Sequence, residues 1–479
     1  NKKRGYPLLM SNDLLKKTSS WKKIISAYIK RILIDFPFIY ELIIKLYLFL
    51  RHILLGFTVV KYKRGSSWKY ISQNRGLLQI TRQKSMKIVQ PLQSFTAHYE
   101  YDEDFSGHAT DIKAIAYYLP QFHAIPENDA WWGTGFTEWT NTRKARPLFP
   151  GHYQPREPHD DIGYYDLSNI EVIKNQVALA KRHGIYGFCF YHYWFHGKRL
   201  LGKPVDLFLK HREIEMPFCL CWANESWSRR WDGSDDLTLI RQIFSPEDDV
   251  EFIEFLEPYL RDSRYIRVNG KPMLIVYRLS KLPNPLETSK RWRNWARKNG
   301  IGELHLVAVS HDEVLPLLHP EDIGFDAYVA FPPHNFTCEE IHGQRRIFDA
   351  GHRFDYESGV NAYPYPNMDT SIYEGCTIGW DNTPRFLRNA TMYLNFSLNS
   401  YYKWLRKIIE NTRAKYPNPD HRFIFINAWN EWSEGAYLEP DRKYGYVYIN
   451  TTSRALFNLP MDCPAQQEEN LKSSVRRTE

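Results

Sequence analysis

Two glutamates near the C-terminal end of the chain have the type and spacing for glycosidic-bond chemistry. Glu431 and Glu434 lie in the run 427–434 (NAWNEWSE). A helical turn there would place both side chains on one face, with Cβ atoms about 5–6 Å apart. Retaining cleavage uses two carboxyl groups at short separation, one protonated and one ionised. A capping or surface pair on an ordinary helix is the alternative, and the flanking Trp and Asn residues favour a catalytic pair.

A second candidate carboxylate follows an earlier apolar run. Glu225, next to Asn224, has the chemistry to orient a sugar hydroxyl, or to act as the acid in a scheme where Glu431 is the nucleophile. The alternative is a salt bridge from Glu225 to Arg229 or Arg230. The sequence leaves these interpretations open.

Aromatic residues are unusually frequent and lie where a binding site is expected. The 479 residues are 15% aromatic and include 15 Trp, 32 Tyr and 27 Phe. Ten of the Trp follow the ends of expected strands, whereas core packing would spread them along the chain. Surplus Trp and Tyr often line surfaces that bind flat, half-apolar ligands. The expected substrate-binding residues are Tyr118, Gln121, His123, Trp132, Trp139, Tyr191, His192, Trp194, Trp222, Asn224, Glu225, Trp227, Trp380, Asp381, Trp429 and Asn430.

Metal and nucleotide chemistry have weaker support. His192 and His196 are potential metal ligands, but no third ligand accompanies them at a sensible spacing. Asp102-Glu103-Asp104 resembles carboxylates that hold a metal–nucleotide-sugar complex, yet it follows a polar linker rather than a buried strand. Neither GxGxxG nor GxxxxGK[ST] occurs. We therefore expect no metal and no cofactor.

A scaffold must bring these separate segments together, and the apolar pattern indicates which one. Short apolar runs alternate with stretches of helical periodicity, clearest at 169–183, 247–261, 287–299 and 392–414. The expected strands are 113–118, 185–190, 217–222, 272–277, 304–310, 325–331, 375–380 and 422–428. Eight buried strands alternating with helices predict an α/β fold, a closed (β/α)8 TIM-type barrel with its site at the C-terminal strand ends. An open doubly wound sheet is the alternative.

The basic charge is concentrated in the N-terminal fifth of the chain. Residues 1–100 carry 19 Lys and Arg against 4 Asp and Glu, whereas the whole chain has a net charge of only +8. This distribution argues against a nucleic-acid partner for the whole protein. The apolar runs at 21–63 are interrupted by charges, so they do not form a transmembrane span or a signal peptide. They predict a basic amphipathic helical segment in a membrane interface, or a helical hairpin that packs on protein.

The expected domain organisation follows from these patterns. It comprises the helical segment 1–63, a linker 64–110, the barrel 111–463 and a polar tail 464–479. The sequence leaves open whether a further domain precedes residue 1. The six Cys suggest reduced cytosolic thiols rather than a disulfide framework. Cys219 and Cys221 alternate in a strand and are expected to pack in the barrel. We expect a cytoplasmic protein, with peripheral binding to the inner face of the membrane through residues 21–63 as an option.

Several long motifs resemble one known family. They are the runs 116–123 (AYYLPQFH), 132–139 (WGTGFTEW), 187–194 (GFCFYHYW), 221–225 (CWANE) and 427–434 (NAWNEWSE). Together, from about Lys113 to Asp441, they resemble the WbsX-like proteins, which are found with surface-polysaccharide and O-antigen assembly and are labelled glycosyltransferases. Their domain is similar to glycoside hydrolase family 99, the endo-acting α-mannosidases, which are (β/α)8 barrels without a required metal.

The resemblance implies roles for the two glutamates. Glu431 would act as a base on the substrate's own 2-hydroxyl and give a 1,2-anhydro sugar, while Glu434 would be the acid and later the base for the acceptor. The residue types alone do not distinguish this route from a direct carboxylate nucleophile. Ser433 stands where the hydrolases are expected to have His, and the aromatic loops differ, so the donor sugar does not carry over.

These observations predict a carbohydrate-active enzyme that makes or breaks a glycosidic bond in cell-surface polysaccharide assembly, with retention. Its expected partners are a polysaccharide or lipid-linked glycan, and a nucleotide sugar if the reaction is a transfer. An endo-acting hydrolase that trims the polymer is one alternative. A catalytically inactive glycan-binding module and a scaffold without saccharide binding are the others.

Overall fold

The computed structural model describes residues 57–64, 67–74, 97–229, 234–310, 319–334, 336–341, 351–364, 369, 371–386 and 389–461. The chain divides into two compact units, Asn1–Val89 and Gln90–Glu479. In the first unit, strands β1 (Phe57–Arg64) and β2 (Ser67–Asn74) pair antiparallel. The expected helical segment ended at residue 63, so its last seven residues are corrected to strand, where Thr58, Val59 and Val60 favour extended backbone. Residues 21–56 and 462–479 lie outside the described residues.

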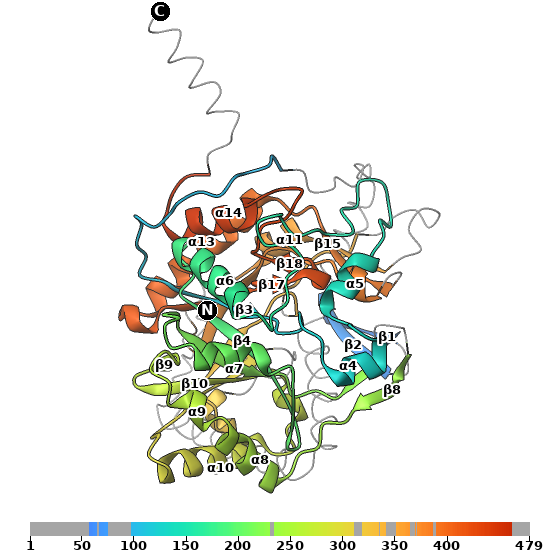
Figure 1. The fold of residues 1–479 in the computed structure, drawn as a ribbon. Coiled ribbons are helices and arrows are strands. Elements are labelled where there is room, and N and C mark those ends of the chain that lie inside the picture. The colour runs from blue at the N-terminus through green and yellow to red at the C-terminus, as the bar shows by residue number, and fades with distance from the viewer. Residues whose placement is uncertain are drawn as a thin grey trace, which may run out of the picture. The chain divides into compact units, whose positions relative to one another are not determined.

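Eight parallel strands in the second unit close into a barrel (Figure 1). Strand β16 pairs with β3, and β10 pairs with β11, so the ring has no free edge. This closure confirms the predicted (β/α)8 barrel and rules out the open sheet. The strands are β3 (Lys113–Tyr118), β4 (Gly187–Phe195), β6 (Phe218–Trp222), β10 (Lys271–Val276), β11 (His305–Ser310), β12 (Ala327–Ala330), β14 (Ile372–Thr377) and β16 (Phe423–Asn427).

Helices surround the barrel and begin where the sequence supplies a cap. The side chain of Asn169 accepts a hydrogen bond from the Glu171 amide, and Ser245 accepts one from the Asp248 amide before a Pro in the first turn. In Figure 1, α8 and α10 lie together on one side and α13 and α14 on another. The helices of the barrel unit are α4 (Pro126–Trp132), α5 (Glu138–Lys144), α6 (Ile170–Arg182), α7 (Lys203–Lys210), α8 (Pro246–Phe255), α9 (Glu257–Leu260), α10 (Pro285–Lys298), α11 (Tyr356–Ala362), α12 (Thr383–Phe386), α13 (Leu398–Lys415) and α14 (Val447–Leu456).

Short strands and 3-10 turns lie in the loops between these elements. Three of the loop strand pairs, β7–β8, β13–β15 and β17–β18, form small separate sheets. The strands are β5 (Lys198–Leu200), β7 (Trp227–Arg229), β8 (Ser234–Ile240), β9 (Arg267–Val268), β13 (His352–Asp355), β15 (Thr391–Leu394), β17 (Asn430–Glu431) and β18 (Ala436–Tyr437). The 3-10 turns are η2 (Leu279–Lys281), η4 (Pro320–Ile323), η6 (Pro419–His421) and η7 (Trp432–Glu434).

The period of two along each strand decides which side chains enter the barrel. On β3, the Tyr117 ring stacks on Tyr191 inside the barrel, with centroids 5.7 Å apart. Its neighbour Tyr118 points outward, where its hydroxyl donates to the Gln176 side chain of α6 at 2.6 Å. Because successive side chains point to opposite faces of a strand, only every second residue of an aromatic run can reach the barrel axis.

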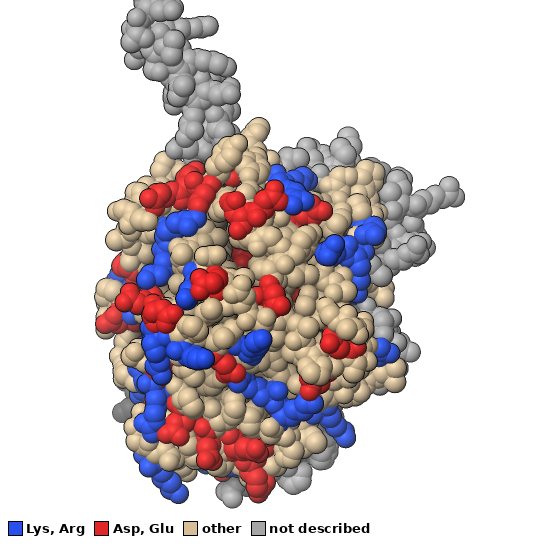
Figure 2. Space-filling view, viewed as in Figure 1, with Lys and Arg blue, Asp and Glu red and all other residues tan. Residues whose placement is uncertain are grey.

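Residues 97–110 pack on the barrel, although the sequence pattern placed them in the linker. Phe105 is buried, and Arg454 of α14 forms ion pairs with Glu100 and Glu103. On the face shown in Figure 2, basic and acidic side chains of the described residues are interspersed. Among the helices that the structure describes, none is long and apolar enough to span a bilayer. The five cysteines in the described part of the chain are free, and Cys219 and Cys221 are buried.

Candidate active site

The segment after the eighth strand forms a tight turn at the C-terminal mouth of the barrel. Asn430 and Glu431 form β17, Trp432 to Glu434 form η7, and Gly435 reverses the chain with φ +64°. The Asn430 side chain accepts from the Leu119 amide at 2.7 Å and donates to its carbonyl oxygen at 3.0 Å. This reciprocal pair joins the eighth strand's loop to the end of the first strand, and it fixes the glutamates that follow.

One guanidinium joins three carboxylates at this mouth. Arg385 of α12 donates from Nε to Glu138 of α5 at 2.7 Å and from Nη2 to Glu431 at 3.1 Å. Its Nη1 donates to Glu434. Arg385 is 9% exposed, Glu431 is 4% exposed and Glu138 is fully buried. The structure therefore brings Glu431 and Glu434 together around one buried cation.

The surroundings favour the protonated form of both glutamates of the pair. Burial, and then the charge of Glu434, raise the pKa of Glu431, while Arg385 opposes the rise. Burial also raises the pKa of Glu434, again against Arg385. Two neighbouring buried carboxylates do not both ionise readily. The pair is thus able to hold one proton at neutral pH and leave the other carboxyl ionised.

The charges of these carboxylates influence tyrosine hydroxyls of the barrel. The Tyr193 hydroxyl accepts from Gln121 Nε2 at 2.9 Å, and burial raises the pKa of that hydroxyl. The negative charge of Glu431 raises the pKa of both Tyr191 and Tyr193 further. Burial raises the pKa of Tyr277, directly after β10; Arg278 opposes this rise, and the charges of Glu225 and Glu434 add to it. Of the predicted site residues, Tyr191 is therefore influenced by the charge of Glu431, and Gln121 is hydrogen-bonded to Tyr193, which the same carboxylate influences.

Asp381 supports the turn from behind. Its Oδ2 accepts from His152 Nε2 at 2.8 Å and from Gln154 Nε2 at 2.7 Å. Its Oδ1 accepts from the amide of Thr383 at 3.1 Å and from the hydroxyl of that residue at 2.6 Å. The backbone amide of Asp381 donates to the Glu434 carbonyl at 2.7 Å. All these contacts are internal, so Asp381 anchors the turn.

Trp380 lies next to this anchor. Trp380 and Asp381 line a cavity of about 70 Å³ together with Tyr393, Gly435 and Tyr448. Trp380 therefore lines a cavity that borders Gly435, the residue directly after Glu434.

Several predicted binding residues point outward from the barrel and do not reach the pair. His192 packs among rings of α8 and α9, and burial holds its pKa well below the usual range. Trp194 donates to Asp248 at 2.8 Å. Trp222 stacks on Phe252 with centroids 4.4 Å apart. These positions, and Tyr118 on β3, are corrected to wall packing, because alternation along the strands turns them away from the axis.

Trp429 and Trp139 also have structural partners. The Trp429 indole donates to the buried Glu439 carboxylate at 3.1 Å. The Trp139 indole donates to the Tyr165 carbonyl at 2.8 Å and packs beside Trp432. Both indole rings are buried beside the turn that carries Glu431 and Glu434, and neither is open to a ligand.

The remaining predicted residues lie in the loops around the mouth. Asn224 accepts from the amide of Arg278 and donates to its carbonyl, and Glu225 forms an ion pair with Arg278 at 3.0 Å. In the described residues, the other rim positions are the buried His123, Trp132 under the Arg229 guanidinium at 5.2 Å, and Trp227 against the Tyr193 ring at 5.0 Å.

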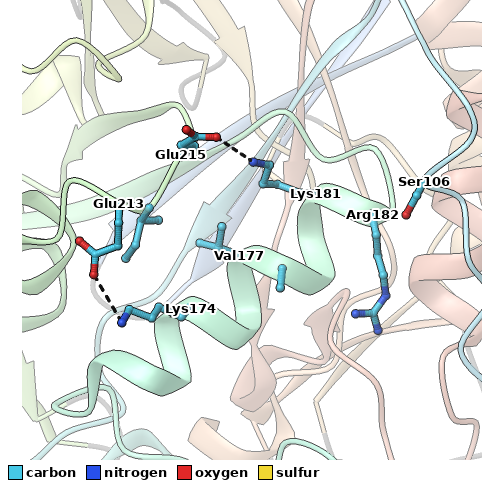
Figure 3. A pocket seen from close by; sticks show the side chains of 9 residues that line it. Ser106, Lys174, Val177, Lys181, Arg182, Glu213 and Glu215 are labelled. Carbon is cyan, nitrogen blue, oxygen red and sulfur yellow. Dashed lines mark ion pairs between the residues drawn. The ribbon is translucent and has the colours of Figure 1, made fainter.

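A larger hollow lies elsewhere on the barrel. It measures about 550 Å³ and lies between α6 and the residues that precede β6 (Figure 3). Its charged side chains are paired across it, Lys174 with Glu213 at 3.4 Å and Lys181 with Glu215 at 4.0 Å. The residues 213–215 come before the N-terminal end of their strand, away from the glutamate pair. Its lining combines paired charges with apolar side chains such as Val177.

The sequence of the barrel matches one family. The family model described as Glycosyltransferase WbsX matches residues 114–452. This chain belongs to the WbsX glycosyltransferase family. Membership confirms the resemblance that the motifs indicated.

The WbsX barrel also has similar relatives and folds. Two proteins of Xanthomonas campestris pv. campestris strains, each named Uncharacterized protein WxcX, are 47% and 46% identical over 350 residues. These matches cover 72% of this chain and 50% of each relative, so the chain spans about half their length. A GH99 endo-alpha-mannosidase from Bacteroides thetaiotaomicron is 15% identical with a TM-score of 0.44, covering 71% of this chain and 96% of that one. A glycoside hydrolase-like protein is 14% identical with a TM-score of 0.48, covering 78% and 98%.

Three site residues of this WbsX protein were missed from the sequence. Glu138 lies in the run 132–139 (WGTGFTEW), in which the aromatic residues indicate a binding surface and nothing in the pattern indicates a buried carboxylate. Arg385 lies in the run 383–386 (TPRF), where one charged residue soon after a strand end was the available signal. Tyr193 was passed over between His192 and Trp194, and counting alternate residues from Tyr191 would have found it. Among the residues that the structure describes, no group of three or more His, Cys, Asp or Glu has a metal-binding arrangement.

Proposed function

We propose that this protein is a retaining-type carbohydrate-active enzyme in which Glu431 and Glu434 are the catalytic pair. Its substrate is a cell-surface polysaccharide or the lipid-linked precursor of one. The observation that supports this most is the pair of carboxyl groups on the two terminal nitrogens of Arg385 at the barrel mouth, where Glu431 is buried and the Glu434 side chain is 17% exposed. A single guanidinium that holds both groups is compatible with the short carboxyl separation that retaining reactions use.

The chemistry follows from the proton that the pair holds. The protonated carboxyl donates to the glycosidic oxygen as the bond from that oxygen to the anomeric carbon breaks. The ionised carboxyl either bonds to the anomeric carbon or takes the proton of the 2-hydroxyl, whose oxygen then closes on that carbon. An acceptor hydroxyl next gives its proton to the first carboxylate and attacks the anomeric carbon. The bond from that carbon to the second carboxylate breaks, or the bond to the 2-oxygen breaks and that oxygen takes its proton back from the second carboxyl. Two displacements restore the original configuration.

The individual roles remain a proposal taken from the resemblance, with Glu434 as acid and Glu431 as base. The tyrosine hydroxyls and Gln121 beside the pair have the chemistry to hold sugar hydroxyls, and Trp132 and Trp227 at the rim offer rings for sugar faces. The family description favours transfer to a growing polymer over hydrolysis. A transfer needs an acceptor site that keeps water from the intermediate.

Product analysis tests this proposal. The full chain would be incubated with the host's surface polysaccharide and its lipid-linked precursor, with and without nucleotide sugars, beside Glu431→Gln and Glu434→Gln. Bond cleavage without a nucleotide sugar, lost in both variants, would establish an endo-glycosidase. Extension that requires a nucleotide sugar, also lost in both, would establish a transferase. Equal behaviour of all three proteins would refute the catalytic pair, and unchanged glycan affinity would then indicate a binding module.

A further inference from the structure

Arg385 holds the two proposed catalytic carboxyl groups, and a third carboxylate, Glu138, offsets its charge. We propose that Arg385 and Glu138 act as one positioning unit: the guanidinium fixes both catalytic carboxyl groups, and Glu138 offsets its charge so that the pair keeps a proton. This inference rests on the proposed function of Glu431 and Glu434. It assigns roles to two residues from loops that follow different strands.

The unit connects three loops of the barrel mouth. Glu138 begins α5 after the first strand, Arg385 lies on α12 after the seventh, and the pair follows the eighth. A guanidinium presents its donors in a rigid plane, so one Arg fixes the directions of three carboxylates at once. Lysine, a single ammonium on a flexible stem, lacks that fork.

Glu138 is placed to neutralise the guanidinium without reaching the substrate. It is fully buried and bonds Arg385 Nε at 2.7 Å, and Asn141 Nδ2 donates to its other oxygen at 3.4 Å. The Thr142 and Ser433 hydroxyls, 2.8 Å apart, join its helix to the catalytic turn. The unit therefore keeps its geometry relative to the pair.

The charge balance explains why Arg385 needs this partner. An unopposed guanidinium bound to two carboxylates favours their ionised forms and lowers both pKa values, which would leave the pair without an acid. The charge of Glu138 offsets that of Arg385, and it contributes to the raised pKa of both Glu431 and Glu434.

The other titratable groups that face the pair do not change this balance. They are Tyr191 and Tyr193 of β4 and Tyr277 after β10. Burial raises the pKa of all three hydroxyls, so they stay neutral over the range in which carboxyl groups titrate.

Two substitutions with opposite effects test the unit. Glu138→Gln keeps an oxygen for Arg385 Nε but removes the negative charge, so the pair should lose its proton about one pH unit lower or more. Arg385→Gln removes the cation and should move proton loss to higher pH by a similar amount. Arg385→Lys keeps the positive charge but loses the planar guanidinium. It should therefore shift the pH at which the pair loses its proton less than Arg385→Gln does, while activity falls. It also serves if the Gln variant does not fold.

Carboxyl titration of ¹³C-glutamate-labelled full chain measures these shifts without a substrate, with Glu431→Gln identifying the signal. Arg454→Gln is the matched control, because it removes another buried guanidinium with two glutamate partners, Glu100 and Glu103. It should leave the pair's titration unmoved. No shift, or shifts in the same direction, would overturn the inference. Opposite shifts in a protein whose Glu431→Gln and Glu434→Gln variants keep turnover would instead refute the proposed function.

Discussion

Replacing Asp381 with Asn is the sharpest test of how the turn is held. Burial alone would raise the pKa of Asp381, but the hydrogen bond and charge of His152 and the charge of Arg156 hold it below its usual range. The carboxylate accepts four hydrogen bonds, two on each oxygen. Asn replaces one of these oxygens with an NH₂ group, which cannot accept.

The cost follows from which donors are able to adapt. An NH₂ group on the Oδ1 side would face the backbone amide of Thr383, which is fixed. On the Oδ2 side, Gln154 is able to flip and offer its oxygen, but His152 is not, because its Nδ1 accepts from the Leu148 amide at 3.0 Å. At least one buried N–H is left without an acceptor, at about 1–3 kcal/mol, and the remaining bonds lose their charge. We expect Asp381→Asn to lower the free energy of unfolding by about 2–4 kcal/mol.

Urea unfolding followed by tryptophan fluorescence measures this difference. Asp420→Asn is the matched control, since it loses only an exposed ion pair with Lys113 and should leave the free energy of unfolding nearly unchanged. The folded-state pKa of Asp381 is depressed, so its stabilisation is present above the unfolded pKa and is lost as pH falls through the folded pKa. The wild type should therefore approach Asp381→Asn in stability below about pH 3.8. A difference under about 0.5 kcal/mol at pH 7 would refute the anchoring role.

The other predictions separate the barrel axis from its wall. Tyr193→Phe should reduce turnover with little change in the urea concentration at the midpoint of unfolding. Trp194→Phe should lower that midpoint, because the hydrogen bond to Asp248 is lost, and should leave glycan affinity unchanged. Lys415→Met should cost about 3–5 kcal/mol in the same assay, because it removes the cation that neutralises the buried Glu374 carboxylate, and adding Glu374→Gln should recover much of it. Activity should persist above the pH at which an ordinary carboxyl loses its proton, because burial raises the pKa of Glu431 and Glu434. A pH–rate profile whose alkaline limb lies near pH 4.5 would contradict this prediction.

The fold was predictable because each strand is a separate apolar run. The runs 113–118 and 422–428 each overlap an observed strand, and together they close the ring. The sequence placed the seventh strand at 375–380, three residues late, because Ile378 and Trp380 continue the apolar pattern beyond β14. The terminal helical segment stays a prediction for residues outside the described ranges, apart from the correction at 57–63.

The site was predictable only in part, because a motif does not state which of its residues face inward. In the run 191–194 the sequence selected Tyr191, His192 and Trp194, and alternation places Tyr191 and the omitted Tyr193 on the axis. Arg385 could not be found from spacing, since its carboxylate partners are 46 to 247 residues away along the chain. Closure of the barrel is what brings such distant loops together.

Ser433 is where the chain departs from the pattern expected of the hydrolases, and its contacts show what this side chain does in the turn. The hydrolases resembled by this chain are expected to have His at that position, between the two glutamates. Here Ser433 is fully buried, and its hydroxyl lies 2.8 Å from Thr142 Oγ1 and donates to the Glu138 carbonyl at 3.4 Å. Its side chain therefore points into α5, away from Arg385 and the pair. The departure changes how the turn is anchored to α5, and α5 also supplies the carboxylate that offsets Arg385, so anchoring and charge balance are set by the same helix.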